Sequence, residues 1–271
     1  MALKTNVVDR VSAYPGRVKL TPVSGQANTY DMVRADQPTQ AGTPLNAALF
    51  RQKSDVLTQD VTVYVTKSGN DSSGEGTSAK PYLTVQKALD SIPKNLGGYV
   101  ATVHIGPGTY DEELFIENFH GGRVTLTGAT TTTVTFTKQI TIRDCYVHFE
   151  YFKVIMSGAY VYVTQGGKFF LGDSVTMTCN GGQYGVFARY NAKVSLGGDI
   201  IVNNTTGAAV RVGACSDMYV HNISGTGNKV AFYGAGGYIR YNISTIEATT
   251  VQTTVTGGRV YTGSQTSAGK Y

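Results

Sequence analysis

The sequence predicts an all-β domain whose backbone winds as a parallel β-solenoid, a coil of short strands stacked turn upon turn. Two observations favour this fold. Apolar runs recur at a nearly fixed spacing in the second half of the chain, and spacings of about 20 to 50 residues indicate stacked structural units. The 271 residues also include 33 glycines, mostly where corners are expected, while Thr, Val and Tyr favour the strands between those corners.

Two tracks of apolar residues define the repeat. The first consists of Val161, Val186, Val210 and Val230, and the second of Phe169, Val194, Met218 and Tyr238. In both tracks the successive spacings are 25, 24 and 20 residues, as expected if each spacing is one turn of a coil. Because side chains alternate along a strand, we expect Val161 and Val163 inside the coil and Tyr160 and Tyr162 outside it.

A third track consists of asparagines that each close an apolar stretch: Asn180, Asn203, Asn222 and Asn242. Asparagine tolerates the left-handed backbone of a sharp corner. Asparagines in register on successive turns can also form a hydrogen-bonded ladder. The track therefore predicts such a ladder, with a simple preference of asparagine for turns as the alternative.

Four segments are expected along the chain. They are an attachment segment at 1–60, a strand with a capping helix at 61–98, the solenoid at 99–250, and a terminal strand or cap with a loose tail at 251–271. The first segment has few apolar residues and one short expected helix, at 43–50. The apolar positions at 85, 88, 89 and 92 share one face of the second helix, which suits it to close the open end of a solenoid of roughly six turns.

Charge and cysteine content exclude several classes of protein. The net charge is +5, but only 15% of the residues are charged and the basic ones are scattered, so no nucleic-acid partner is expected. Residues 1–10 have no apolar stretch of the kind that a signal peptide carries, and no apolar run is long enough for a membrane span, so neither is expected. Cys145, Cys179 and Cys215 are expected to be small apolar strand residues in a chain made in a reducing cytoplasm.

One stretch of sequence resembles the start of pectin-lyase-like proteins. The segments are YLTVQKALDSIP at 82–93 and VHIGPGTY at 103–110. The resemblance implies a right-handed parallel β-helix that begins with a capping helix. Pectin methylesterases carry a close version of these segments, but the motif that supplies their catalytic aspartate has no counterpart here. The resemblance therefore concerns the fold, which does not by itself imply an activity.

A second resemblance lies near the N-terminus, in YPGRVKLTPV at 14–23, NTYDMVRAD at 28–36 and GTPLN at 42–46. These segments are similar to the N-terminal part of tail-fibre and receptor-binding proteins of bacteriophages and phage-like particles. The resemblance implies attachment to a tail or baseplate, assembly as a homotrimer and a distal domain that faces the host. The attachment residues that it suggests are Tyr14, Pro15, Gly16, Tyr30, Asp31, Arg34 and Asp36.

Tyrosines crowd the later turns and are the candidate binding residues: Tyr160, Tyr162, Tyr184, Tyr190, Tyr219 and Tyr233. A tyrosine offers a flat apolar face and a polar tip, which suits both protein interfaces and sugar rings. Three interpretations stay open. The tyrosines could pack between trimer subunits, stand as isolated surface residues, or form a glycan-binding face.

Carboxylates on successive turns suggest an alternative function, the cleavage of a polysaccharide. Glycoside hydrolysis needs two carboxyl groups roughly 5 to 10 Å apart, and neighbouring turns are about 4.8 Å apart. The candidates are Asp173, Asp199 and Asp217, which fall at similar expected corners; the alternative is that aspartate simply favours turns. The histidines lack the spacing of a zinc site, and neither a metal nor a cofactor is expected.

Together these patterns predict a phage-type receptor-binding subunit that acts without catalysis. We expect a homotrimer, held to tail or baseplate proteins through residues 1–60, which recognises a bacterial surface glycan or protein. Such a chain would be made in the host cytoplasm and would act outside the cell as part of a virion or phage-like particle. The alternatives are a tail-borne depolymerase, either a hydrolase or a lyase, and a structural spike that binds no receptor.

Overall fold

The structure is a computed structural model and describes residues 11–12, 18–24, 30–34, 38–40, 56–129 and 132–262. The chain divides into two compact units, residues 1–54 and residues 55–271. In the first unit, β1 (Val11–Ser12) pairs with β4 (Pro38–Gln40) and β2 (Val18–Pro22) pairs with β3 (Tyr30–Arg34), both antiparallel. The helix predicted at 43–50 lies outside the described residues.

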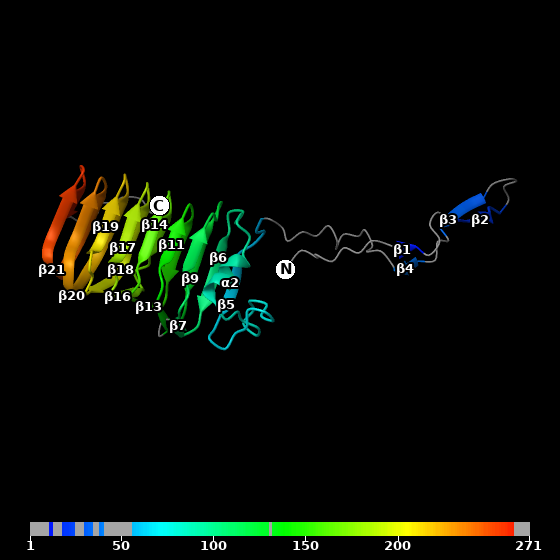
Figure 1. The fold of residues 1–271 in the computed structure, drawn as a ribbon, viewed down its shortest axis with the longest axis horizontal. Helices are drawn as coiled ribbons and strands as arrows, with labels where there is room; N and C mark the ends of the chain where they lie inside the picture. Colours follow the sequence, from blue (N-terminus) through cyan, green and yellow to red (C-terminus); the bar gives the residue numbers. More distant parts are fainter. Residues whose placement is uncertain are drawn as a thin grey trace. The chain divides into compact units, whose positions relative to one another are not determined.

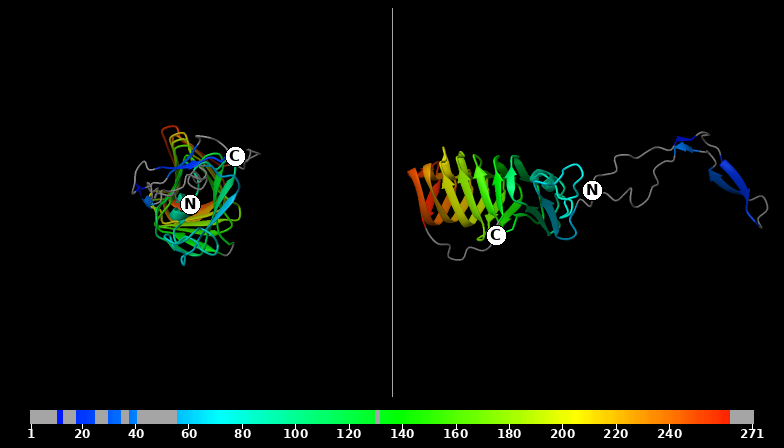
Figure 2. Two further views of the ribbon diagram at one scale, coloured as in Figure 1. Left: turned by 90° about the vertical axis from the view of Figure 1, so that its right-hand side faces the viewer. Right: turned by 90° about the horizontal axis from the view of Figure 1, so that it is seen from below.

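The second unit is a parallel β-solenoid of about seven turns (Figures 1 and 2). Its strands pair in parallel into three faces, and each strand lies beside the equivalent strand of the next turn. This confirms the solenoid and adds about one turn to the number expected, because the regular winding continues through Val255.

The strands that compose each face follow one another turn by turn. Face 1 consists of β5 (Val61–Val65), β6 (Val100–Ile105), β9 (Arg123–Thr127), β12 (Tyr146–Glu150), β15 (Lys168–Leu171), the first parts of β18 (Lys193–Asn203), β20 (Asp217–Ala235) and β21 (Tyr238–Val255), and β22 (Arg259–Thr262). Face 2 consists of β7 (Gly108–Tyr110), β10 (Thr133–Phe136), β13 (Lys153–Ser157), β16 (Thr176–Asn180), the end of β18 and the middle of β20 and β21. Face 3 consists of β8 (Leu114–Glu117), β11 (Ile140–Arg143), β14 (Val161–Thr164), β17 (Tyr184–Arg189), β19 (Ala208–Gly213) and the ends of β20 and β21.

The interior of the coil is filled by the side chains that alternate inward along each short strand. Val161 and Val163 are fully buried, whereas Tyr160 and Tyr162 lie on the outside and are half-buried, as predicted. The largest fully buried side chains are Tyr110, Phe119, Phe136, Phe149, Phe152, Phe169 and Phe232. Their burial is the main source of stability, at about 25 cal/mol per Å² of apolar surface removed from water.

The two apolar tracks are confirmed over their first three members and wrong at the fourth. Val210 pairs with Phe232 rather than Val230, so that step is 22 residues and not 20. Likewise, Met218 pairs with Ile239 and not with Tyr238. A slip of one residue moves a side chain to the other side of the sheet. Ile239 is accordingly buried, while Tyr238 is 43% exposed.

The asparagine ladder is wrong in its predicted form. Asn180 and Asn203 share a register position, but Asn222 lies over Asp199 and donates a hydrogen bond of 2.8 Å to its carboxylate. The reason is an irregularity between Leu196 and Asp199, where β18 has one more residue than β20. The corner instead uses Asn228, which is buried and donates to the carbonyl of Val202.

The helix α2 (Val85–Asp90) lies in the chain between β5 and β6, the first two strands of face 1, and its N-cap is Thr84. The cap hydroxyl accepts a hydrogen bond from the backbone N–H of Lys87, which satisfies one of the free donors at a helix start. Val85, Ala88 and Leu89 are buried. No helix among residues 56–129 and 132–262 or the shorter described segments is long and apolar enough to cross a membrane.

The cysteines differ from one another in their placement. Only Cys179 is both buried and on a strand, as predicted for all three. Cys145 is buried at a corner, and Cys215 is exposed at a corner with a φ of 61°. Burial raises the pKa of the Cys145 and Cys179 thiols to about 12, so both are neutral small apolar groups at physiological pH.

Candidate functional site

The outward side chains of face 3 form a continuous row of large groups over its later turns. Because parallel turns stack in register about 4.8 Å apart, equivalent outward positions lie directly beside one another. Tyr162 of β14 lies beside Phe187 of β17, then Arg211 of β19, then Tyr233 of β20. We call these four side chains, together with Tyr160 and Tyr184, the aromatic ladder.

The rings of the aromatic ladder pack against one another rather than against the solenoid interior. The ring centroids of Tyr162 and Phe187 are 5.1 Å apart, those of Tyr184 and Phe187 are 5.0 Å apart, and those of Tyr160 and Tyr184 are 5.3 Å apart. Tyr184 and Phe187 are buried, with Tyr160, Tyr162 and Tyr233 partly buried around them. The ladder is thus a second apolar cluster, separate from the core. Burial and the neighbouring tyrosines raise the pKa of Tyr160.

Arg211 is held between aromatic rings on both sides. Its guanidinium carbon lies 4.7 Å from the ring centroid of Phe187 and 4.8 Å from that of Tyr233. Its Nη1 donates a hydrogen bond of 2.5 Å to the hydroxyl of Tyr184. These contacts are cation–π interactions reinforced by one hydrogen bond, and together they fix the orientation of the guanidinium.

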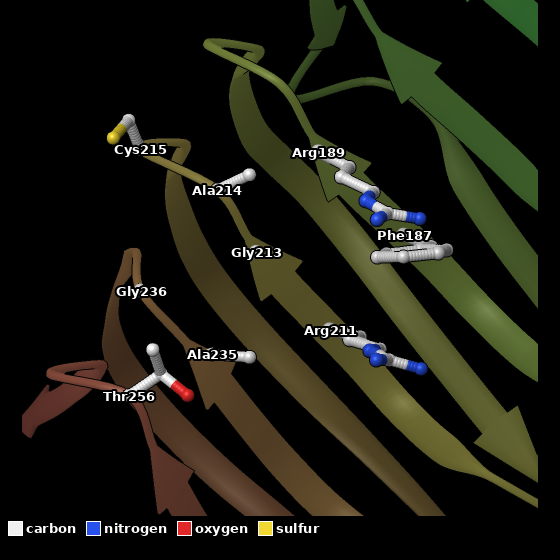
Figure 3. A pocket seen from close by; sticks show the side chains of 9 residues that line it. All are labelled: Phe187, Arg189, Arg211, Gly213, Ala214, Cys215, Ala235, Gly236 and Thr256. Carbon is white, nitrogen blue, oxygen red and sulfur yellow. The ribbon is translucent and has the colours of Figure 1, made fainter.

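A hollow of about 550 Å³ adjoins the ladder where face 3 ends (Figure 3). It is lined by Phe187, Arg189, Arg211, Gly213, Ala214, Cys215, Ala235, Gly236 and Thr256. Gly213 pairs with Ala235 of the next turn, so two small residues leave space beside the long side chains. Figure 3 shows the guanidinium groups of Arg189 and Arg211 pointing the same way, with the Phe187 ring between them in this view.

The structure brings four of the six predicted tyrosines together, namely Tyr160, Tyr162, Tyr184 and Tyr233. Tyr190 follows β17 in a left-handed conformation with a φ of 58°, and Arg189 lies over its ring at 4.2 Å. Tyr219 is on a different face, face 1, in register with Ser195 and Arg240.

Three residues of the site were not among the predicted binding residues: Phe187, Arg189 and Arg211. The signal for two of them was present in the sequence. Phe187 and Arg211 each directly follow a member of the first apolar track, Val186 and Val210. Alternation places such residues on the outside, as it did for Tyr162. Alternation also places Arg189 on the outside, two residues after Phe187, but its position at the hollow depends on the small side chains that neighbour it on later turns.

The three candidate catalytic aspartates do not all share a corner. Asp173 lies in the corner after β15, and Asp199 begins the part of β18 that belongs to face 2. Asp217 is at the opposite end of the face 1 strand, in register with Lys193 and Tyr238. Asp173 and Asp199 therefore both lie where face 1 passes into face 2, on successive turns, whereas the prediction of a corresponding corner is wrong for Asp217.

Other carboxylates of the early turns have structural partners. Glu112 accepts hydrogen bonds of 2.9 Å from the backbone N–H groups of Val85 and Gln86 at the start of α2, and burial raises its pKa. Glu117 pairs with Arg143. Glu150 contacts His148 at 2.9 Å. Among the residues that the structure describes, no group of three His, Cys, Asp or Glu side chains is arranged to hold a metal ion.

The predicted attachment residues belong to the first unit. Tyr30, Asp31 and Arg34 lie on β3, opposite β2, and Tyr30 is 55% exposed. The other four, Tyr14, Pro15, Gly16 and Asp36, lie outside the described residues.

The aromatic ladder and its hollow therefore combine flat apolar surfaces with oriented positive charge on one side of a rigid scaffold. Such a surface can bind a ring-shaped ligand by stacking and an anionic group by charge-assisted hydrogen bonds. Comparison with family models, with curated proteins and with solved structures finds no match to this chain.

Proposed function

We propose that this protein is a receptor-binding subunit of a phage-type tail, which attaches the particle to a bacterial surface glycan or protein without cleaving it. The observation that carries the proposal is the aromatic ladder on face 3. Its rings form a cluster apart from the interior of the solenoid, and Tyr160, Tyr162 and Tyr233 stay partly exposed on the outside of face 3. Aromatic side chains and arginine are the residues most enriched at the energetic centres of binding surfaces.

The attachment and assembly parts of the proposal rest on the N-terminal sequence. Residues 14–46 resemble tail-fibre attachment segments, and residues 1–54 form a unit of their own. We propose that this unit holds the protein to a tail or baseplate and that three copies assemble around one axis. Three weak sites on one particle would then gain avidity without new contacts.

The details of the fold beyond the solenoid itself are also part of the proposal. We propose that the coil is right-handed, as in pectin-lyase-like proteins, and that α2 caps its first turn. Contacts of the Gln86 side chain support the capping role. Its amide accepts a hydrogen bond of 2.8 Å from the N–H of Phe115 and donates to the carbonyl of the same residue at 3.4 Å. It thereby satisfies the open edge of β8, which would otherwise invite pairing with another chain.

The direct test is binding of the labelled, full-length protein to a panel of bacterial cells and immobilised surface polysaccharides. We expect saturable binding to at least one of them, and we expect Tyr162→Ala and Tyr233→Ala each to weaken it by more than about tenfold, because truncating a central aromatic anchor costs about 2 kcal/mol. Tyr219→Ala is the matched control, since it removes the same side chain from face 1 and should leave binding unchanged. Equal binding by all three variants would show that face 3 is not the recognition surface.

The proposed homotrimer is tested separately, by the molar mass of the protein in solution. Light scattering of the purified protein should give about three times the chain mass of 28.9 kDa. A mass of one chain at micromolar concentration would contradict the trimer while leaving the binding surface to be judged by the experiment above.

A further inference from the structure

The hollow beside the aromatic ladder has the chemistry of a site for a negatively charged group. We propose that Arg189 and Arg211 bind the carboxylate or phosphate of an acidic saccharide there, with the sugar ring lying against Phe187. This inference rests on the proposed function, because it names the class of ligand that the same face would recognise.

The first argument is uncompensated charge. Arg189 and Arg211 carry two positive charges on neighbouring turns, and the residues that line the hollow include neither Asp nor Glu. Within the described part of the chain, neither arginine forms an ion pair with a carboxylate; their contacts are with aromatic side chains. Arg143, on the same face at an earlier turn, shows the usual arrangement, since it pairs with Glu117.

The second argument is preorganisation. Arg211 is stacked between Phe187 and Tyr233, and one of its N–H groups is used by the hydroxyl of Tyr184. Its Nε is buried and makes no hydrogen bond with the described residues. A guanidinium has five N–H donors in a planar fork that matches a carboxylate or phosphate. Because this fork is held in place before binding, less conformational entropy is lost when an anionic ligand binds.

The third argument is the room that Gly213 leaves for a ligand in the hollow. At Gly213, an added Cβ would meet the carbonyl oxygen of Ala235 at 3.4 Å and the Cγ of Arg189 at 3.9 Å, which are ordinary contact distances. The backbone there tolerates a side chain, yet the position is glycine, and the space that a side chain would fill is part of the hollow between the two turns. The Cβ of Gly213→Val should therefore meet only ordinary contacts, and its methyl groups should take up part of the hollow.

The experiment is calorimetric titration of the full-length protein with matched charged and neutral probes. The carboxylate probe is a hexasaccharide of alternating glucuronate and N-acetylglucosamine, and its control is the same hexasaccharide with the carboxyl groups reduced to alcohols. The phosphate probe is a hexasaccharide whose glucose units are joined through phosphodiester groups. We expect at least one anionic probe to bind about tenfold or more tightly than the reduced hexasaccharide, which is the size of one charge-assisted hydrogen bond. Binding of only one anionic probe would identify whether the group is a carboxylate or a phosphate.

Single substitutions distinguish binding at the hollow from a general attraction of anions to the positively charged protein. Arg189→Gln, Arg211→Gln and Gly213→Val should each weaken binding of the anionic probe by about tenfold, whereas Arg240→Gln, which removes the same charge from face 1, should not. Thermal melting identifies any variant that fails to fold. Arg189→Gln should perturb folding least, because the Arg189 side chain is exposed to solvent.

Three results would overturn the inference in distinguishable ways. Equal affinity for the charged and the reduced hexasaccharide, still lost in Tyr162→Ala, would remove the anionic specificity and leave the aromatic ladder as a receptor site. If Arg240→Gln weakened binding as much as Arg189→Gln did, the attraction would be general charge and not the hollow. Binding of none of these probes, together with no binding to bacterial cells, would overturn the proposed function as well.

Discussion

Face 1 and face 3 are built on the same turns of the same coil, but their outward rows differ. On face 1 the row reads Thr62, Thr102, Thr125, His148, Phe170, Ser195, Tyr219, Arg240 and Tyr261. On face 3 it reads Phe115, Thr141, Tyr162, Phe187, Arg211, Tyr233 and Thr253. Ser195 separates the aromatic residues of face 1, whereas four large side chains follow one another without a gap on face 3.

The difference shows which features the fold needs and which it does not. A solenoid turn requires apolar residues inside and tolerates almost any residue outside. Both faces meet the inward requirement, and face 1 does so with threonines on the outer side of its early turns and with aromatic residues that Ser195 interrupts on the outer side of the later ones. The continuous aromatic row of face 3 is therefore an addition to the fold, which is why we assign the binding role to that face.

The largest expected effect is a difference in the free energy of unfolding between substitutions at two neighbouring residues of β20, one inside face 3 and one outside it. Phe232 is fully buried, so Phe232→Ala should lower the free energy of unfolding by about 3 to 5 kcal/mol through lost burial and a cavity. Tyr233 faces outward, and Tyr233→Ala should cost about 1 kcal/mol or less. Urea unfolding followed by circular dichroism measures both. Similar losses for the two variants would mean that the ladder is part of what holds the coil together.

A smaller effect tests whether Arg211 is held by its neighbours. In a double-mutant cycle with Arg211→Met and Tyr184→Phe, we expect a coupling of about 1 kcal/mol in unfolding free energy, because the pair shares a hydrogen bond within a cluster of rings. The cycle with Arg240→Met and Tyr219→Phe on face 1 is the control and should give a coupling near zero. A coupling that is no larger on face 3 than on face 1 would remove the argument for a preorganised guanidinium.

The fold was predictable from the sequence because its strongest signal is repetition. The apolar residues at 161, 186 and 210 have the spacing and the inward position that the structure shows. The prediction failed where turn length changed: Val230 and Tyr238 were aligned by matching residue types, and irregularities in the long strands β18 and β20 shifted the true partners by one or two residues.

The site was only partly predictable, for a related reason. Tyrosine is conspicuous in a sequence, so Tyr160, Tyr162, Tyr184 and Tyr233 were found without knowledge of the register. Tyr219 was grouped with them by residue type, and it is the register that places it on another face. The hollow depends on pairs of small residues brought together from successive turns, such as Gly213 and Ala235. Neither residue is distinctive until the length of each turn is known.

The smallest expected effect is a pH dependence that belongs to face 1. Burial between Tyr146 and Phe170 lowers the pKa of His148; a hydrogen bond to Glu150 partly offsets this, and Arg123 adds to the lowering. The unfolded chain therefore takes up this proton at a higher pH than the folded protein does, and stability is lost as the pH falls below about 6.5. A difference of one pH unit between the two pKa values corresponds to about 1.4 kcal/mol.

His148→Gln isolates this contribution, because glutamine stays neutral and can still donate a hydrogen bond to Glu150. We expect the stability of the wild type to decline between pH 7 and pH 5 relative to that of the variant, measured by urea unfolding at each pH. Glu112, whose pKa burial raises, acts in the opposite direction but equally in both proteins, so it cancels in the difference. Parallel pH profiles would show that the pKa of His148 is the same in the folded and the unfolded chain, so that its hydrogen bond to Glu150 fully offsets its burial. Face 1 would then carry a balanced ion pair at His148, whereas Arg211 on face 3 has no carboxylate partner among the described residues.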